Sequence, residues 1–354
     1  MPLSQLSAQP YQEAHQDTDF DAFLCFSQVL KACADPLRVQ ILNALNDDTF
    51  GVLELTQIFE TKQSGMSHHL KVLNQAGLVE AQREGNAIFY RRPLNFNEAH
   101  DREAIEHILQ LIDRFPLSDD ILNKISEIHS QRAIQSQAFF TKNADRFQAH
   151  QELIADHAQY APASFELLCQ SFHEPSFHKH RSVPKRVMEI GPGEGLFLPL
   201  ISPRFSEVIA LDNSEDMLKK ARIQAHKQGL NNIQFHLGDT FFYRQMTEQN
   251  KLPRVDAVVM NMVLHHIPTP AKVFQDIASF LHNQGVLIVC ELSHHNQTWT
   301  KENCGDIWLG FETEELSKWA ENAGFKTDKT AFIGLRNGFQ IQLRKFVKSE
   351  LSGK

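Results

Sequence analysis

The stretch RVMEIGPGEGLFLPLI, residues 186–201, decides the fold of most of the chain. It opens with apolar residues typical of a buried strand, passes three glycines spaced G-x-G-x-G, and ends in an apolar run typical of a helix. A glycine loop between a strand and a helix lets the backbone turn tightly and approach a ligand at the helix N-terminus. The stretch therefore predicts a ligand-binding loop, although such a loop alone is a weak signal.

Strand-like segments follow this loop at a spacing that leaves room for helices between them. They lie within residues 206–218, 233–240, 255–270 and 285–293. Strands that alternate with helices form a doubly wound parallel sheet. Asp212 ends the second strand about 20 residues after the loop, where a carboxylate can hold both ribose hydroxyls. Residues 329–347 then predict two antiparallel strands around a turn at Arg336-Asn337-Gly338.

An antiparallel hairpin that closes a parallel sheet is not typical of nicotinamide dehydrogenases. The segment of about residues 180–348 instead resembles the class I S-adenosylmethionine-dependent methyltransferases. The resemblance implies S-adenosyl-L-methionine as cofactor, with another nucleotide cofactor as the alternative. It implies that Glu189 and three glycines face the methionine part, Asp212 the ribose, Asp239 the adenine, and that Asn261 lies beside the methyl group. The cofactor-binding residues expected are Glu189, Gly191, Gly193, Gly195, Asp212, Asn213, Gly238, Asp239 and Asn261.

The methyl acceptor is expected to be a small molecule. The motifs of DNA base methyltransferases are absent, and NMVLHHIPTP at 261–270 resembles the small-molecule branch that includes quinone-biosynthesis methyltransferases. A hydroxyl or amine acceptor must lose a proton, and His265 or His266 is placed to accept it. We take His265 as the candidate catalytic residue, with simple packing of the pair as the alternative. Further candidates to line the acceptor side, in a segment expected to be mobile, are Glu291, His294, His295, Trp299 and Trp308.

The front of the chain has a different pattern. Residues 30–45 and 64–79 have the apolar period of helices, and residues 78–92 predict two strands around REGN. The helix at 64–79 places its polar side chains opposite a buried stripe, free to meet phosphates and base edges. Residues 61–92 hold five Lys and Arg against two Glu, a net +3 in a chain of net charge −8. The expected DNA-binding residues are Gln63, Ser64, Ser67, His68, Lys71 and, in the hairpin, Arg83.

LKACADPLRVQILNAL and MSHHLKVLNQAGLVEAQREGNAIFYRR resemble the ArsR/SmtB family of dimeric bacterial repressors over about residues 22–113. The resemblance implies a winged helix-turn-helix, a homodimer paired through a helix at about 98–113, and an operator with an inverted repeat. Gly51 and Leu53 replace the arsenic-binding cysteines, and Asp101-x-Glu103 replaces the zinc pattern, so no metal site is expected. His68 and His69 point about 100° apart on a helix and are poorly placed to share a metal.

The whole chain is therefore expected to be an α/β protein. An N-terminal winged helix-turn-helix domain precedes a C-terminal Rossmann-like doubly wound sheet with a terminal antiparallel hairpin. The expected boundaries are a disordered tail at 1–20, the winged helix with its dimerisation helix at 21–113, a helical connector and lid at 114–180, and the methyltransferase domain at 181–348.

The chain is expected to be cytoplasmic. It lacks a secretion signal and any apolar run of the roughly 18 residues that a membrane span needs, and its five cysteines are scattered and odd in number. Three functions stay open: a DNA-binding regulator fused to an active small-molecule methyltransferase, which we favour; a pure regulator that senses S-adenosylmethionine or S-adenosylhomocysteine; and an enzyme whose winged helix only dimerises. Operator binding and methyl turnover distinguish them.

Overall fold

The structure, a computed structural model, describes residues 13–85, 87–94, 99–143, 147–172 and 186–350. The chain divides into two compact units, Met1–Ile125 and Ser126–Lys354. The last residues of the expected helical connector, 173–180, lie outside the described residues.

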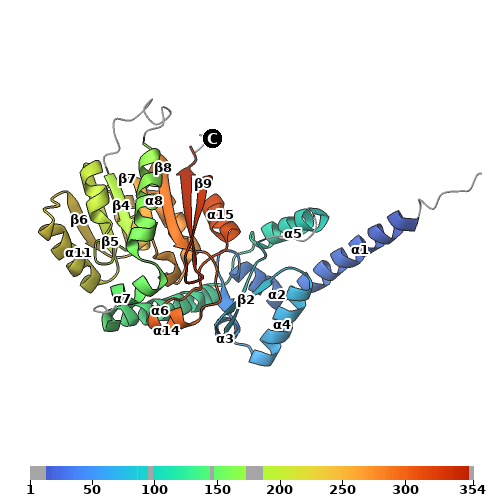
Figure 1. Ribbon diagram of the computed structural model, residues 1–354. Coiled ribbons are helices and arrows are strands. Elements are labelled where there is room, and N and C mark those ends of the chain that lie inside the picture. The colour runs from blue at the N-terminus through green and yellow to red at the C-terminus, as the bar shows by residue number, and fades with distance from the viewer. Residues whose placement is uncertain (1–12, 86, 95–98, 144–146, 173–185, 351–354) are drawn as a thin grey trace, which may run out of the picture. The chain divides into compact units, whose positions relative to one another are not determined.

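The first unit is a winged helix-turn-helix, as predicted (Figure 1). Asp35 begins the second helix by accepting a hydrogen bond from the backbone N–H of Arg38 at 3.0 Å, with Pro36 in the first turn. Two strands pair in antiparallel register, Glu80 opposite Arg91, and a short third strand joins the second of them. The elements are α1 (Glu13–Cys33), α2 (Pro36–Ala44), β1 (Phe50–Gly51), α3 (Val52–Ile58), α4 (Gln63–Gln75), β2 (Glu80–Glu84), β3 (Ala87–Arg91), α5 (Ala99–Ile112) and the start of α6 (Asp119–Asn143).

Helix α1 begins at Glu13, inside the stretch where a disordered tail was expected. Residues 13–20 contain neither Gly nor Pro, so nothing in them stops the helix that the apolar residues after Phe23 support. The expected tail is therefore too long at its C-terminal end.

The second unit is built on a mostly parallel sheet. Within the part of the chain that the structure describes, seven strands lie in the order β6-β5-β4-β7-β8-β10-β9. The first five strands are parallel, and β10 pairs antiparallel with both β8 and β9, which confirms the predicted fold class. The strands are β4 (Arg186–Ile190), β5 (Glu207–Asp212), β6 (Ile233–Leu237), β7 (Val255–Asn261), β8 (Leu281–Leu292), β9 (Phe325–Gly334) and β10 (Gln340–Lys348).

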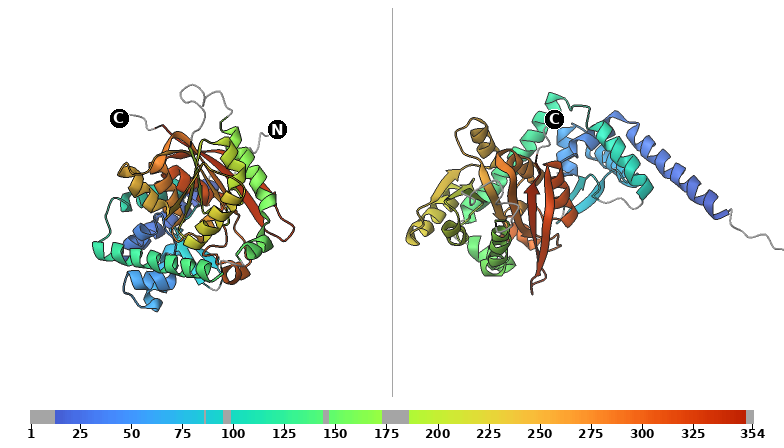
Figure 2. Two further views of the ribbon diagram at one scale, coloured as in Figure 1. Left: turned by 90° about the vertical axis from the view of Figure 1, so that its left-hand side faces the viewer. Right: turned by 90° about the horizontal axis from the view of Figure 1, so that it is seen from above.

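Helices cover both faces of this sheet (Figures 1 and 2). On one face the core joins Tyr160 and Leu168 of a covering helix to Val187, Val259 and Ile288 of the central strands. Strands buried on both faces have continuous apolar runs, which is why the sequence predicts them. The helical elements are α7 (Phe147–Ile154), α8 (His157–Gln170), α10 (Leu198–Ile201), η1 (Ser202–Arg204), α11 (Glu215–Lys227), α12 (Thr240–Glu248), η2 (Leu264–His266), α13 (Pro270–Phe280), α14 (Trp299–Asn303) and α15 (Thr313–Asn322).

Among the described residues, no helix combines the length and apolar character that a membrane crossing requires.

Candidate functional site

A cavity of about 580 Å³ lies in the second unit, at the carboxyl ends of β4, β5 and β7. After β4 the chain places β5 and β6 on one side of that strand and β7 and β8 on the other. Loops part at such a switch point and leave a crevice where doubly wound sheets bind their ligands. The expected cofactor residues reach this cavity with one exception: it is lined by Glu189, Gly191, Gly193, Asp212, Asn213, Gly238, Asp239 and Asn261.

The exception is Gly195, which does not line the cavity in the structure. Its φ of +82° favours glycine, and a Cβ there would lie 3.1 Å from the backbone of Ala221 in α11. This glycine therefore serves the packing of the loop against a helix. Gly193, by contrast, has a φ of +54° and would place a Cβ in open space, so its backbone is accessible from the cavity.

Two carboxylates stand at the ends of neighbouring strands in this cavity. Asp212 accepts a hydrogen bond from the backbone N–H of Ser214 at 2.9 Å. Burial raises the pKa of Asp212 to about 6, against the lowering effect of backbone N–H groups. Burial, with Asp212 nearby, raises the pKa of Glu189 to about 8. Glu189 is thus largely protonated at neutral pH.

Two other expected cofactor-binding side chains, those of Asp239 and Asn261, are positioned by hydrogen bonds that involve helices. Asp239 is the N-cap of α12, where its Oδ1 accepts from the backbone N–H of Phe242 at 2.8 Å. Asn261 accepts a hydrogen bond from the hydroxyl of Ser164 in α8 at 2.7 Å. The residue after Asn261, Met262, also lines the cavity and has a φ of +55°, a strained value for a residue with a side chain.

The buried polar atoms of the cavity wall include Oε2 of Glu189 and Nδ2 of Asn261, which make no hydrogen bond to any described residue. A buried polar atom without a partner costs roughly 1–3 kcal/mol. A ligand that brings its own polar groups removes that cost, so the residues present fit a cofactor with an ammonium and hydroxyl groups.

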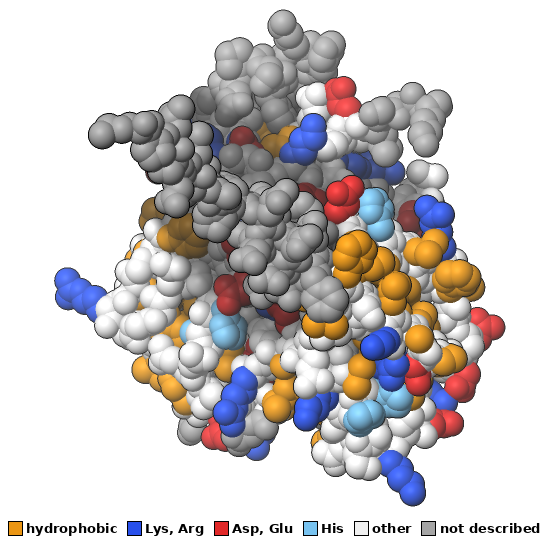
Figure 3. All heavy atoms as spheres, turned by 90° about the vertical axis from the view of Figure 1, so that its right-hand side faces the viewer, with side chains coloured by type: hydrophobic (Ala, Val, Ile, Leu, Met, Phe, Trp, Pro, Cys, Tyr) orange, Lys and Arg blue, Asp and Glu red, His pale blue; other side chains and the backbone are white. Residues whose placement is uncertain are grey.

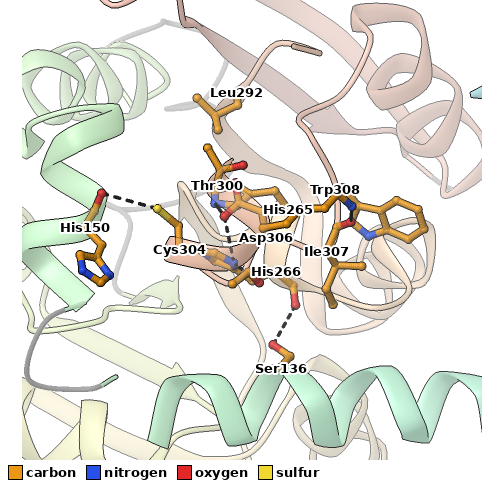
Figure 4. A network of polar contacts seen from close by, with 12 residues as sticks. Ser136, His150, His265, His266, Leu292, Thr300, Cys304, Asp306, Ile307 and Trp308 are labelled. Atoms are coloured by element: carbon orange, nitrogen blue, oxygen red, sulfur yellow. Dashed lines mark hydrogen bonds and ion pairs between the residues drawn. The ribbon is translucent and has the colours of Figure 1, made fainter. Parts of the chain in front are cut away.

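The two adjacent histidines have different positions (Figure 4). His266 lines the cavity, whereas His265 does not and is 1% exposed. His265 Nδ1 lies 2.5 Å from Oε1 of Glu291, and its Nε2 lies 3.7 Å from Asp306. His265, whose ring lies between two carboxylates, therefore does not line the cavity, and His266 is the one of the two candidate histidines that does.

Among the described residues, one group has spacing that suits a metal ion. The ligand atoms of His265, His266 and Asp306 lie within 4.8 Å of one another, and all three side chains are buried. The sequence motifs for metal concern the first domain, so this group was not foreseen.

The segment expected to be mobile, residues 294–311, is fixed by hydrogen bonds. The backbone N–H groups of Ile307 and Trp308 both donate to the carbonyl of His265, at 3.0 and 3.1 Å. The Trp308 indole donates to the carbonyl of Ile267 at 2.9 Å and lies under the Arg132 guanidinium. As a result, the residues expected to line the acceptor side do not line the cavity: Glu291, His294, His295, Trp299 and Trp308.

That part of the cavity wall is formed instead by helices expected to be a connector. The cavity-lining side chains from α6, α7 and α8 are Ser126, His129, Ser130, Ala133, Ser136, Phe140, Gln151, His157 and Tyr160. The sequence did contain a signal for this lining. Along α6, small and polar residues repeat at helical spacing on the side where a packed helix usually has an apolar stripe.

In the first unit, the six expected DNA-binding residues are all exposed, five on α4 and one on the β2–β3 hairpin. Met66, Leu70 and Leu73 are buried on the opposite side of α4. His68 is exposed, while His69 is half-buried with its Nδ1 3.9 Å from Asp35. A Cβ at Gly65 would meet no described atom within 4 Å, so this helical glycine is not required by packing inside the unit.

Comparisons with known proteins fit both units. Residues 35–81 match the family model of the arsR family of bacterial regulatory proteins, and residues 182–324 match that of a methyltransferase domain. The arsenical resistance operon repressor of Staphylococcus xylosus is 32% identical over 93 residues, which are 26% of this chain and 82% of the repressor. The transcriptional activator HlyU of Vibrio cholerae is 42% identical over 62 residues, 18% of this chain and 57% of HlyU.

The second unit has a curated relative of its own. Ubiquinone biosynthesis O-methyltransferase of Aeromonas salmonicida is 25% identical over 129 residues, 35% of this chain and 50% of the enzyme. The chain thus spans only about half the length of HlyU and of this enzyme. The predictions of a methyltransferase domain and of its cofactor, S-adenosyl-L-methionine, are confirmed at the level of the domain family. The chain belongs to the ArsR family through its winged helix-turn-helix, to which an S-adenosylmethionine-dependent methyltransferase domain is fused.

Proposed function

We infer that the protein is a DNA-binding regulator whose second domain transfers a methyl group from S-adenosylmethionine to a small molecule. The observation that supports it best is the cavity wall, where unpaired atoms of Glu189 and Asn261 lie in the same space as the imidazole of His266. A pure regulator would need only the groups that bind the cofactor. The cavity also contains an imidazole, a side chain that can accept a proton from a methyl acceptor, and this favours an active methyltransferase over a pure regulator.

The residues of the cavity have separable roles in this proposal. Glu189 and Asp212 bind the cofactor, Asp239 orients its far end, and Asn261 lies beside the reacting group. The cofactor, when bound, supplies an activated methyl group. The protein supplies alignment and the exclusion of water, because methyl transfer is an in-line displacement. Among the described residues of α6, α7 and α8, the cavity-lining side chains carry no Lys or Arg, which favours an uncharged acceptor.

We infer that the first domain binds an inverted repeat as a homodimer. Helix α1, the end of α5 and the turn after it carry large exposed apolar side chains. Figure 3 views one face of the molecule, where orange hydrophobic side chains lie among Lys, Arg and His side chains. Exposed apolar clusters of this kind mark interaction sites. The residues are Phe23, Leu24, Phe26, Leu30, Leu111 and Phe115. The proposed DNA contacts are those predicted: Gln63, Ser64, Ser67, His68, Lys71 and Arg83.

The proposed cofactor site makes binding depend on pH. Below about pH 8, Glu189 must lose a proton before its carboxylate can pair with a cationic ligand, so affinity rises with pH. Between about pH 6 and 7, where the α-ammonium of the ligand stays protonated, we expect the Kd for S-adenosylmethionine to fall about ten-fold by calorimetry. Glu189→Gln removes the titrating group and should flatten this dependence. A wild-type affinity that is constant or weakens as pH rises would contradict the assignment of Glu189.

Operator binding should depend on Lys71 and Arg83. Replacing both with Ala removes two cations from the proposed DNA-binding face, and we expect weaker binding with a salt slope lower by about one unit for each phosphate that is no longer neutralised. The operator is first recovered by selection from random DNA. The control is Lys219→Ala with Lys326→Ala, which changes the net charge equally at exposed positions of the second unit. Equally weakened binding in both variants, or recovery of no palindromic site, would favour an enzyme whose winged helix only dimerises.

A further inference from the structure

Helix α8 carries a polar stripe on the side that reaches the cavity. The helix covers the sheet beside β7 and β8 (Figure 1). His157, Tyr160 and Ser164 are three and four residues apart, so they share one side of the helix. The first two line the cavity, while Ser164 is 0% exposed and does not line it. One turn further on, Leu168 joins the hydrophobic core. The polar part of this side is therefore the part nearest the cavity.

Ser164 determines how the side-chain amide of Asn261 is turned. Its hydroxyl donates to Oδ1 of Asn261 at 2.7 Å, from α8 to the end of β7. An amide carries its acceptor oxygen and its donor nitrogen on one planar group, so a hydrogen bond at the oxygen fixes the direction of the nitrogen. Asn261 lines the cavity, and its Nδ2 makes no hydrogen bond to any described residue. The cavity wall thus holds an amide donor without a partner.

A second group without a partner lies on the neighbouring strand. It is Oε2 of Glu189, on β4. Glu189 pairs with Val259 of β7, and Asn261 follows Val259 by two residues, so the acid and the amide share one face of the sheet. Strands lie about 4.8 Å apart and rise about 3.3 Å per residue, which separates the two Cα atoms by roughly 8 Å. Both side chains therefore stand at the same end of the cavity.

The two groups together match a zwitterion. A carboxylate such as that of Glu189 pairs with an ammonium group, whereas an amide nitrogen donates to a carboxylate. An α-amino acid carries both groups on one carbon, and S-adenosylmethionine ends in an α-amino acid. The Lys and Arg side chains among the described cavity residues, Arg244 and Lys272, belong to α12 and α13, and Arg244 is held by Asp276 at 2.7 Å.

We propose that Ser164 is a positioning residue for the cofactor. It turns Asn261 so that Nδ2 donates to the α-carboxylate of S-adenosylmethionine, while Glu189 pairs with the α-ammonium. The inference rests on the proposed function only in that S-adenosylmethionine is the ligand of this cavity. With the amide turned the other way, Oδ1 would face the carboxylate and repel it. The orientation that Ser164 imposes therefore selects a ligand whose amino-acid end is intact.

The test compares two ligands by calorimetry, S-adenosylmethionine and its decarboxylated form, which keeps the ammonium and lacks the carboxylate. We expect wild type to prefer S-adenosylmethionine about ten- to hundred-fold, the value of a hydrogen bond to a charged group. Ser164→Ala lets the amide turn, so this preference should fall about ten-fold while affinity for the decarboxylated form changes little. Asn261→Asp keeps the oxygen that accepts from Ser164 and replaces the donor nitrogen with oxygen, so it should reverse the preference.

The control is Ser171→Ala, at the C-cap of the same helix. Ser171 is also buried, but its hydroxyl donates to the carbonyl of Leu167 at 3.1 Å, so this variant should keep the wild-type preference. Thermal unfolding of each variant shows that it is folded. Equal binding of both ligands by wild type, an equal loss for both in Ser164→Ala, or an Asn261→Asp variant that still prefers the carboxylate would overturn the inference. Wild type that binds neither ligand would overturn the proposed function as well, so the two failures are distinguishable.

Discussion

Asp212→Ala is expected to weaken S-adenosylmethionine binding about ten- to hundred-fold. A charge-assisted pair of hydrogen bonds to the ribose is worth on the order of 1.5–3 kcal/mol, and each 1.4 kcal/mol is a factor of ten in affinity. S-adenosylhomocysteine has the same ribose, so its affinity should fall by the same factor. Calorimetry with both ligands measures the two effects.

The matched control for this variant is Asp216→Ala, an exposed acid in the first turn of α11 only four residues away. It should bind both ligands as wild type does. Asp212 also accepts from the backbone N–H of Ser214, so thermal unfolding and operator binding are measured to show that the variant remains folded. If wild type and Asp212→Ala bind S-adenosylmethionine equally, the cofactor site is misassigned.

The cofactor side of the cavity could be predicted from sequence because its signals are local. Gly191, Gly193 and Asp212 each follow or end a buried strand, and the carboxyl ends of parallel strands meet at one edge of the sheet. Gly195 belongs to the same motif but acts in packing, because its Cβ position faces Ala221. The glycine motif predicts that the chain turns here, but only the structure shows which of its glycines line the cavity.

The rest of the cavity wall could not be predicted in the same way, because its residues come from segments far apart in sequence. Choosing between His265 and His266 depends on Glu291 and Asp306, which lie 26 and 41 residues after His265. The cavity-lining stripe on α6 had no partner in the sequence that would mark it as functional. Tertiary contacts determine both which histidine lines the cavity and what the stripe on α6 faces. Local sequence propensities do not predict such contacts.

One helix carries the chain from the first unit into the second. In the first unit, Lys124 of α6 pairs with Glu60 at 3.0 Å, and Glu60 lies just before α4. From Ser126 onward, α6 belongs to the second unit, where it lines the cavity. A continuous helix transmits displacement better than a flexible linker. This continuity is the reason to expect that the ligand of the cavity affects operator binding.

Breaking α6 should separate the two activities. A Gly-Gly insertion after Ile125 places two residues of low helix propensity at the boundary of the units, at a cost of about 1 kcal/mol each. We expect the insertion variant to bind both operator and cofactor, with operator affinity no longer dependent on cofactor.

We expect the methyltransferase cavity to be coupled to operator recognition within one chain, and operator titrations test this coupling most directly. Wild type is titrated with the selected palindromic DNA at fixed salt in the presence of S-adenosylmethionine, of S-adenosylhomocysteine, or of neither. We predict that at least one ligand shifts operator affinity by about 5- to 150-fold, the usual range for coupled sites, and that Asp212→Ala removes the shift at the same ligand concentration. Three superimposable wild-type curves, measured with the cavity shown by calorimetry to be filled, would contradict the account.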